Sequence, residues 1–191
     1  LINIQNSYLL AVNSIWIFKE EIIKLFKKKI FNLHIGKLPN QKGAGGASWQ
    51  IMSQEETTAV TIHELTEKVD EGKILFEKTV YIRKKSSLLE YYQNANQIEK
   101  VLLKRLINMV NKRKQPRLRK INNRNSIYMP RLDTKTHGFI NWEWKGIDIF
   151  NFIRAFDQPY SGASTLYKNK LIHIQKVDLI DKHKFFHPFQ S

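Results

Sequence analysis

A short apolar segment of the chain carries an asparagine and a histidine two positions apart, Asn32 and His34. The segment 29–34 is rich in β-branched and aromatic residues and ends just before Gly36, which is typical of a buried strand. Because side chains alternate along a strand, we expect Asn32 and His34 on the same face. An amide N–H can stabilise the oxyanion that forms when a carbonyl is attacked, and an imidazole can carry a proton near neutral pH. The pair therefore indicates attack on a carbonyl, at the strand end where α/β sheets bind ligands.

Two further segments hold residues that are suited to a ligand site. The glycine-rich run 43–46 precedes a helix-like segment, and backbone N–H groups at such a position can bind an anion. It is not a Walker loop, because no Gly-Lys-Ser/Thr sequence follows it. The loop region 64–72 is acidic, and charge alone does not separate a functional carboxylate there from a solvated one: its acidic residues are Glu64, Glu67, Asp70 and Glu71.

Taken together, these motifs resemble the folate-dependent formyltransferases. The resemblance rests on Asn32-x-His34-x-x-x-Leu38-Pro39, on the glycine-rich loop from Gly43, and on Asp70-x-Gly72 followed by apolar residues. It implies transfer of a formyl group from 10-formyltetrahydrofolate to an amine, with Asn32, His34 and Asp70 as catalytic residues. By the same resemblance, Asp70 orients the imidazole of His34 and tunes its charge.

The resemblance also implies binding residues. The pocket for the folate ring is expected to be lined by Asp70 and by four consecutive residues, Ile15, Trp16, Ile17 and Phe18. Contacts to the acceptor substrate are expected from Gly43, Trp49, Arg131 and His137. Plain core packing is the competing interpretation for the aromatic residues of both sets. No metal site is expected.

The later part of the chain bears on the acceptor. The string 152–156 and the residues after it resemble the start of the carboxyl-terminal domain of methionyl-tRNA and sugar formyltransferases, which the glycinamide ribonucleotide enzyme lacks. The segments 43–52 and 130–132 are more similar to the sugar enzymes. The leading hypothesis is therefore formylation of a dTDP- or UDP-linked amino sugar. Methionyl-tRNA formyltransferase and a non-catalytic folate- or nucleotide-binding fragment are the alternatives, and a homodimer is compatible with any of the three.

The elements that must position these residues follow an α/β pattern. The apolar segment 8–12 predicts a parallel strand, 19–28 an amphipathic helix, and 74–82 a further strand. Ser87 and Glu90 form a capping-box pattern that opens a long helix to about residue 111. The expected fold is a partial Rossmann-like formyltransferase domain with a mostly parallel sheet and flanking helices. Its amino-terminal βα units are expected to be missing, because the chain opens with Leu1 inside an apolar run.

The segment 57–64 alternates apolar and polar residues and predicts a half-exposed strand. It includes His63, which we expect to be a solvent-facing or structural histidine. Nothing in the local pattern connects His63 with the catalytic residues.

Changes in composition along the sequence predict three regions. Residues 1–112 are expected to form the catalytic domain, 113–127 a basic linker, and 128–191 a small carboxyl-terminal subdomain of mixed or β-rich structure. Seven of the thirteen residues from 112 to 124 are Lys or Arg, a run that is typical of a solvated segment. A helix over 147–156 and a hairpin turning at Asn169-Lys170 are expected in the subdomain.

Composition limits the partners. Lys plus Arg number 32 against 17 Asp plus Glu, a formal net charge of +15, which attracts polyanions such as tRNA, sugar nucleotides or folate polyglutamate. There is no cysteine, which excludes disulfides and thiolate metal sites. No apolar run is long enough to span a membrane, and no signal-peptide pattern opens the chain, so a cytoplasmic location and no membrane partner are expected.

Overall fold

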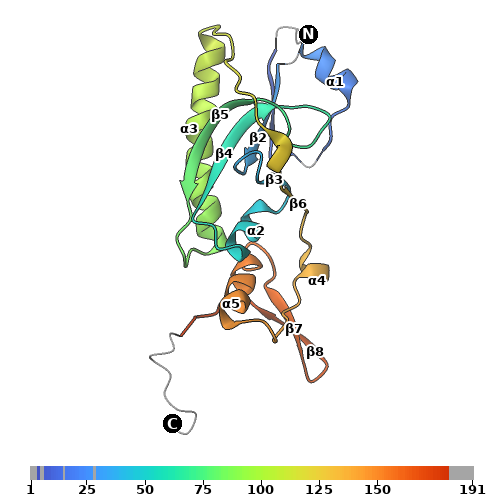
Figure 1. The fold of residues 1–191 in the computed structure, drawn as a ribbon, viewed down its shortest axis with the longest axis vertical. Helices are drawn as coiled ribbons and strands as arrows, with labels where there is room; N and C mark the ends of the chain where they lie inside the picture. The colour runs from blue at the N-terminus through green and yellow to red at the C-terminus, as the bar shows by residue number, and fades with distance from the viewer. Residues whose placement is uncertain (1–3, 5–6, 15, 28, 181–191) are drawn as a thin grey trace.

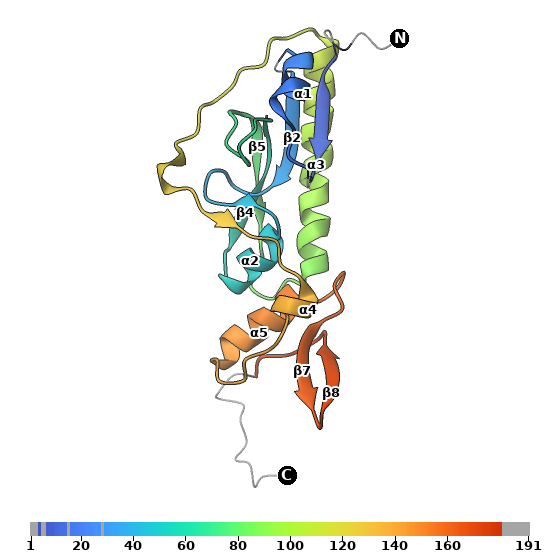
Figure 2. The ribbon, with the colours of Figure 1, turned by 90° about the vertical axis from the view of Figure 1, so that its right-hand side faces the viewer.

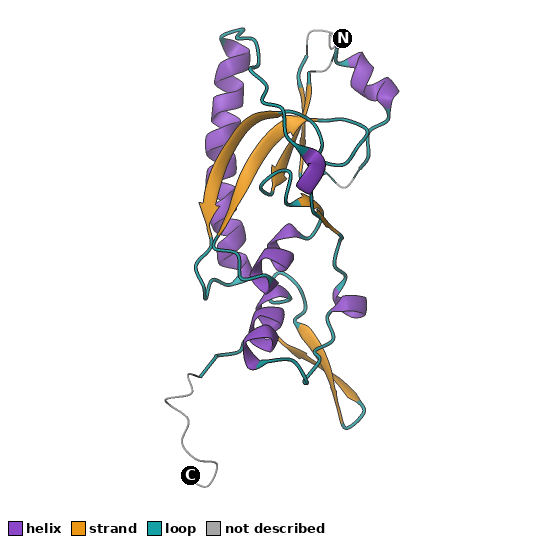
Figure 3. Cartoon of the chain, viewed as in Figure 1, coloured by secondary structure: helices purple, strands orange, loops and turns teal. Residues whose placement is uncertain are grey.

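The computed structural model describes residues 4, 7–14, 16–27 and 29–180. A four-stranded sheet with a long helix along it forms one part of the molecule, and a smaller group of helices with a β-hairpin forms the other (Figures 1 and 3). Among the described residues, no helix is long and apolar enough to cross a membrane.

The sheet contains four strands in the order β1-β2-β4-β5. Their bounds are β1 Leu9–Val12, β2 Ile30–Ile35, β4 Thr57–Glu64 and β5 Ile74–Tyr81. The pairing of β1 with β2 is parallel, whereas β2 with β4 and β4 with β5 are antiparallel. The α/β fold class is thus confirmed, and the described sheet is mixed, with one parallel pairing.

Strand β2 occupies the interior of the sheet and separates two environments. Phe31 and Leu33 point into the apolar core beneath helix α3 (Leu88–Asn111), together with Val60 and Ile62 of β4. The alternate residues of β2 point to the opposite face. Strand β4 is buried along nearly its whole length, so the expectation of a half-exposed strand was wrong. Its polar residues Thr58, Thr61 and His63 are covered by other parts of the chain, where they pair with Gln41, with the Gly36 carbonyl and with the Glu64 carbonyl.

Helix α3 joins the two parts of the molecule. Its start is the predicted capping box, in which the Ser87 side chain accepts from the Glu90 N–H and the Glu90 carboxylate accepts from the Ser87 N–H. Leu102 and Leu106 in its second half pack against the sheet, whereas Tyr91 near its start packs in the second core. Figure 2 shows the helix running along one side of the sheet toward the smaller part.

The second core is built between α3 and the carboxyl-terminal elements. Helices α2 (Gly46–Met52) and α5 (Gly146–Ala155) contribute Ile51 and Phe152 to it. The predicted hairpin is present as β7 (Ala163–Tyr167) and β8 (Lys170–Ile174). The short helix α4 (Thr134–His137) precedes these elements.

The basic linker is anchored to the sheet at one point. The backbone groups of Arg119 and Ile74 exchange two hydrogen bonds, of 2.9 and 2.8 Å, and the Arg119 guanidinium lies 3.1 Å from the Glu77 carboxylate. The segment then passes through a short 3₁₀ turn (Asn123–Asn125) on the side of the sheet away from α3 and reaches β6 (Tyr128–Met129) (Figure 2). Strand β6 pairs in parallel with the two-residue strand β3 (Lys42–Gly43).

Helix α1 (Glu20–Leu25) is shorter than the predicted 19–28, and none of its residues is buried. Ile22, an apolar residue of this predicted amphipathic helix, is 41% exposed. The amphipathic pattern is therefore present in the sequence, but its apolar face is not covered by the part of the chain that the structure describes.

The packing of α3 yields a stability prediction. Leu102 is 1% exposed in the core under the sheet, so Leu102→Ala is expected to lower the free energy of unfolding by about 2–5 kcal/mol. Leu89→Ala is the matched control, because Leu89 lies in the same helix but is 45% exposed, and a change below about 0.5 kcal/mol is expected. Urea unfolding measures both, and equal losses for the two variants would contradict the assigned core.

Candidate active site

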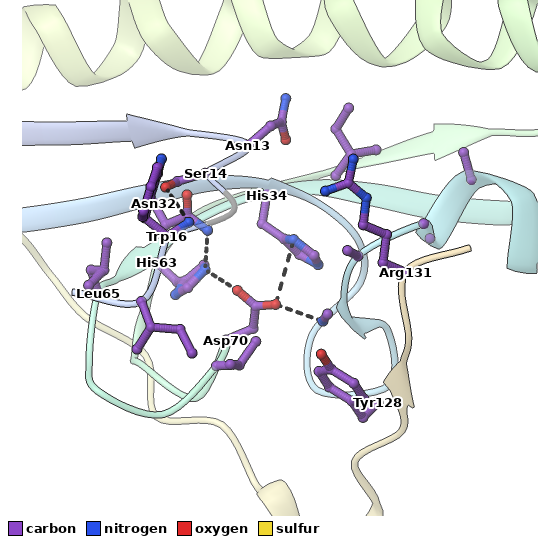
Figure 4. Close-up of a pocket in the computed structure, with 18 of the residues that line it drawn as sticks. Asn13, Ser14, Trp16, Asn32, His34, His63, Leu65, Asp70, Tyr128 and Arg131 are labelled. Atoms are coloured by element: carbon purple, nitrogen blue, oxygen red, sulfur yellow. Dashed lines mark hydrogen bonds and ion pairs between the residues drawn. The ribbon is translucent and has the colours of Figure 1, made fainter. Parts of the chain in front are cut away.

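A cleft of about 790 Å³ opens on the face of the sheet opposite α3, within the size range of small-molecule sites. Its walls come from four regions that are distant in sequence: the loop after β1, the end of β2 with the glycine-rich loop, the loop between β4 and β5, and the segment around β6. Figure 4 shows the polar residues at its floor.

The floor of the cleft is set by strand register. Asn32 and His34 lie on the same face of β2, as their spacing predicted, and both are 8% exposed. In the antiparallel pairing of β2 with β4, Asn32 lies directly opposite His63. The Asn32 Nδ2 lies 3.4 Å from the His63 Nε2, so the two strands place an amide and a second imidazole side by side.

Asp70 reaches this pair from the loop after β4. Its Oδ1 lies 3.3 Å from the His63 Nε2, and its Oδ2 lies 3.8 Å from the His34 Nδ1. The Gly43 N–H of β3 donates to the same Oδ2 at 2.8 Å. Figure 4 shows the carboxylate between the two imidazoles, with the glycine-rich loop on its far side.

The charge of Asp70 is maintained by its partners. Burial alone would raise the pKa of this carboxyl, but the hydrogen bond from His63, the nearby His34 and the Gly43 N–H lower the pKa to about 2. The group is therefore ionised at neutral pH. Asp70 itself adopts φ +52°, a conformation that is uncommon for a residue with a side chain.

Close packing explains why the Asp-x-Gly motif has a glycine at position 72. A Cβ on Gly72 would collide with the backbone of Glu64, because the chain returns closely past the end of β4. Glu71, between Asp70 and Gly72, accepts from the Lys42 Nζ at 2.9 Å, and the Lys42 side chain is only 6% exposed. Two consecutive residues of β3 thus hold two consecutive residues of the loop between β4 and β5.

His34 is held so that one ring nitrogen remains a base. Its Nε2 lies 2.6 Å from the carbonyl of Gln41, and because a carbonyl can only accept, this nitrogen carries the proton. Burial lowers the pKa of His34, against the opposing effects of Asp70 and of the Gln41 carbonyl. The imidazole is therefore neutral near pH 7, with the lone pair of Nδ1 directed toward the side of Asp70. A Cβ on Gly36 would collide with this ring.

Asn32 presents an unused acceptor. Its Oδ1 is buried and has no hydrogen-bond partner among the described residues. Such a group is costly unless a ligand pairs with it. An amide, a neutral imidazole and a fixed carboxylate in one cleft can together stabilise an oxyanion, accept a proton and bind an amine.

The structure brings most of the predicted binding residues to the cleft. Trp16, Ile17 and Phe18 line one wall, and Gly43 and Arg131 line another, while Ile15 lies outside the described residues. Figure 4 shows Trp16 and Arg131 on opposite sides of the catalytic floor.

Two predicted acceptor contacts lie elsewhere. Trp49 and His137 line a separate apolar pocket beside Trp144 and Phe152, so the structure does not bring these two residues to the cleft. The reason is the orientation of α2, which turns Trp49 toward the segment after β6, where its Nε1–H donates to the Pro130 carbonyl. His137 lies at the end of α4, where its Nδ1 accepts from the Asp133 N–H.

Several lining residues were missed in the sequence. His63 was expected to face solvent or to be structural; it is 2% exposed and lies on the floor of the cleft beside Asn32. Its position opposite Asn32 depends on the β2–β4 register, which no local pattern reveals. Other lining residues that were not predicted include Asn13 and Ser14 after β1, Leu65 and Val69 in the loop after β4, and residues of α3 and of the segments after it: Tyr92, Asn96, Tyr128 and Tyr160.

Comparison with known proteins gives consistent matches. The family described as formyl transferase matches residues 4–107, and the formyl transferase C-terminal domain matches residues 133–188. A bifunctional polymyxin resistance protein ArnA from Wigglesworthia glossinidia brevipalpis is 31% identical over 82% of this chain and 24% of its own length. A methionyl-tRNA formyltransferase from Prochlorococcus marinus is 27% identical over 88% of this chain and 52% of its own. The chain thus spans about a quarter of the length of the first relative and about half of the length of the second.

Solved structures agree with these matches. WlaRD, a sugar 3N-formyl transferase determined with dTDP and 5-N-formyl-THF, has a TM-score of 0.71 and 25% identity, over 85% of this chain and 58% of that one. An N-formyltransferase from Helicobacter canadensis, determined with folinic acid and dTDP-3-aminofucose, has a TM-score of 0.64 and 28% identity, over 74% and 52% of the two chains.

The low pKa of Asp70 yields a prediction about pH and stability. A carboxyl whose pKa falls from its ordinary value to about 2 on folding stabilises the native state above the ordinary value, and this contribution is lost as pH falls toward 2. We expect about 2 kcal/mol of such stability in the parent protein and none in Asp70→Asn. Urea unfolding between pH 6 and pH 2.5 measures the difference. Asp178→Asn, at an exposed position, is expected to follow the parent, and a parent curve parallel to that of Asp70→Asn would contradict the burial of an ionised carboxylate.

Proposed function

The chain belongs to the formyltransferase family, and we propose on that basis that it transfers a formyl group from 10-formyltetrahydrofolate to the amino group of a dTDP- or UDP-linked amino sugar. The observation that carries this proposal is the convergence of Asn32, His34 and Asp70 at the floor of one cleft. Its walls offer separate sides for a donor and an acceptor (Figure 4).

Each catalytic side chain has a role that follows from its contacts. The formyl donor supplies an electrophilic carbon, to which the acceptor amine forms a C–N bond while the bond from that carbon to the donor nitrogen breaks. The Asn32 amide donates to the oxygen on which negative charge develops. The Nδ1 of His34 takes a proton from the amine and returns it to the departing donor nitrogen. Asp70 stabilises the imidazolium that exists between these two transfers, because its Oδ2 lies 3.8 Å from that nitrogen.

The residues present fit a folate donor. Trp16 and Ile17 are 78% and 70% exposed on the wall next to Asn32, so apolar surface is available there for a flat ring. The unpartnered Asn32 Oδ1 offers an acceptor to an N–H group of a ligand. By resemblance to the family, the segment 15–18 would hold the pteridine ring.

The opposite wall supports a nucleotide-linked acceptor. Arg131 supplies a cation suited to a phosphate, and the tyrosine side chains of Tyr128 and Tyr160 supply flat surface for a base or a sugar. Two similar structures of at least 25% identity are sugar N-formyltransferases determined with dTDP or a dTDP-sugar. These observations favour a sugar nucleotide over the other acceptors.

Methionyl-tRNA is the second candidate acceptor. The net charge of +15 and the run of basic residues at 112–124 favour a polyanion, and the relative from Prochlorococcus marinus is a methionyl-tRNA formyltransferase. Binding of folate or nucleotide without turnover is the third candidate, since the chain spans only part of its relatives.

Substitution of the catalytic pair tests the reaction. In the full-length protein we expect Asn32→Ala to lower kcat by about 10²–10³-fold, because a donor to the developing charge is lost. His34→Ala is expected to lower kcat by about 10²–10⁴-fold through loss of the base. Release of tetrahydrofolate measures both. Asn94→Ala, at an exposed position of α3, is the control, and near-parental turnover in either cleft variant would refute the assignment.

Ionic strength separates the acceptors. With a dTDP- or UDP-amino sugar we expect kcat/KM to fall by less than about tenfold between 50 and 200 mM salt, because only two phosphates are bound. With methionyl-tRNA a fall of about 10³-fold is expected for a protein that contacts many phosphates. Turnover with tRNA alone, and with that steep dependence, would replace the sugar nucleotide as the acceptor.

A further inference from the structure

We propose that His63 is a positioning residue of the reaction, whose Nε2 orients the Asn32 amide when it carries no proton and holds the Asp70 carboxylate when it carries one. The proposal rests on the function proposed above and assigns His63 no contact with substrate. It arises from the geometry of one ring nitrogen, which lies within 3.4 Å of the Asn32 Nδ2 and 3.3 Å of the Asp70 Oδ1.

The orientation of the His63 ring is set from its other side. Its Nδ1 lies 2.8 Å from the Glu64 carbonyl, and a carbonyl can only accept, so this nitrogen is a proton donor. The ring is 2% exposed in the strand β4, and it meets the ring of His34 edge-on at 6.2 Å between centroids. Backbone and packing together therefore fix the direction in which Nε2 points.

This arrangement determines which end of the Asn32 amide faces the cleft. The two ends of a carboxamide have nearly the same shape but opposite hydrogen-bonding character. An Nε2 that carries no proton accepts from the Asn32 Nδ2 and holds the nitrogen end on the catalytic floor. Without that acceptor the amide can rotate, and its oxygen would then face the oxygen of the formyl group, where it would repel the developing negative charge.

The same nitrogen acts on Asp70. When Nε2 carries a proton, it donates to the Asp70 Oδ1, and the hydrogen bond between His63 and Asp70 contributes to the low pKa of that carboxyl. The other groups that face Asp70 are His34 on β2 and the Gly43 N–H on β3, with the Lys42–Glu71 ion pair beside them. His63 is thus the one side chain among the described residues that contacts both Asn32 and Asp70.

Two substitutions separate positioning from simple packing. His63→Phe keeps a buried ring of similar size but removes both hydrogen bonds, and we expect kcat to fall about 100-fold while KM for the formyl donor changes less than about twofold. His63→Gln supplies an acceptor and a donor from one carboxamide, and recovery to within about tenfold of the parent kcat is expected. His173→Ala, an exposed histidine of the hairpin, is the control.

A higher kcat in His63→Phe than in His63→Gln would overturn the proposal. If His63 serves only to fill space, His63→Phe retains the parental kcat and His63→Gln is the more damaged variant.

A spectroscopic measurement is independent of turnover. In protein carrying ¹³C-labelled aspartate, the Asp70 carboxyl is expected to titrate near pH 2 in the parent and at higher pH in His63→Phe. An unchanged titration would overturn the contact between His63 and Asp70, whatever the acceptor proves to be. Absence of formyl transfer by the parent protein, with the titration shifted as expected, would instead refute the proposed function and leave the positioning of Asp70 intact.

Discussion

The buried negative charge of Asp70 constrains the whole site. A carboxylate that is 8% exposed requires partners, and its three partners come from three different strands: His34 from β2, Gly43 from β3 and His63 from β4. The hydrogen bond from the Gly43 N–H to the Asp70 carboxylate therefore fixes the position of the glycine-rich loop against the sheet. It also accounts for the close return of the chain at Gly72, without which the carboxylate would not reach the floor of the cleft.

The parts of the structure that follow from local chemistry were predictable. The alternation that placed Asn32 and His34 on one face of β2, and the capping box that starts α3 at Ser87, depend only on neighbours in sequence. The position of His63 opposite Asn32 depends on strand register, and the position of Trp49 and His137 outside the cleft depends on how α2 and α4 are oriented. Those properties are set by packing between distant segments, and they are not visible in a single sequence.

The site contrasts electrostatically with the rest of the chain. The protein carries a formal charge of +15, yet the centre of the cleft is a carboxylate between two imidazoles. A positive field can draw an anionic ligand toward the molecule, while the local negative charge favours a cation, such as a protonated imidazole, at the catalytic floor. The basic residues of the chain thus provide long-range attraction of anions, whereas the Asp70 carboxylate sets the local charge in the cleft.

The pairing of β3 with β6 has a consequence for the order in which the protein is made. The residues proposed to be catalytic all precede residue 71, but β3, which holds Asp70 through Gly43, is paired with residues 128 and 129. During synthesis the side chains of the site leave the ribosome well before the strand that steadies them. The cleft around Asp70 is therefore completed late in translation, by a segment that contributes none of the three proposed catalytic side chains.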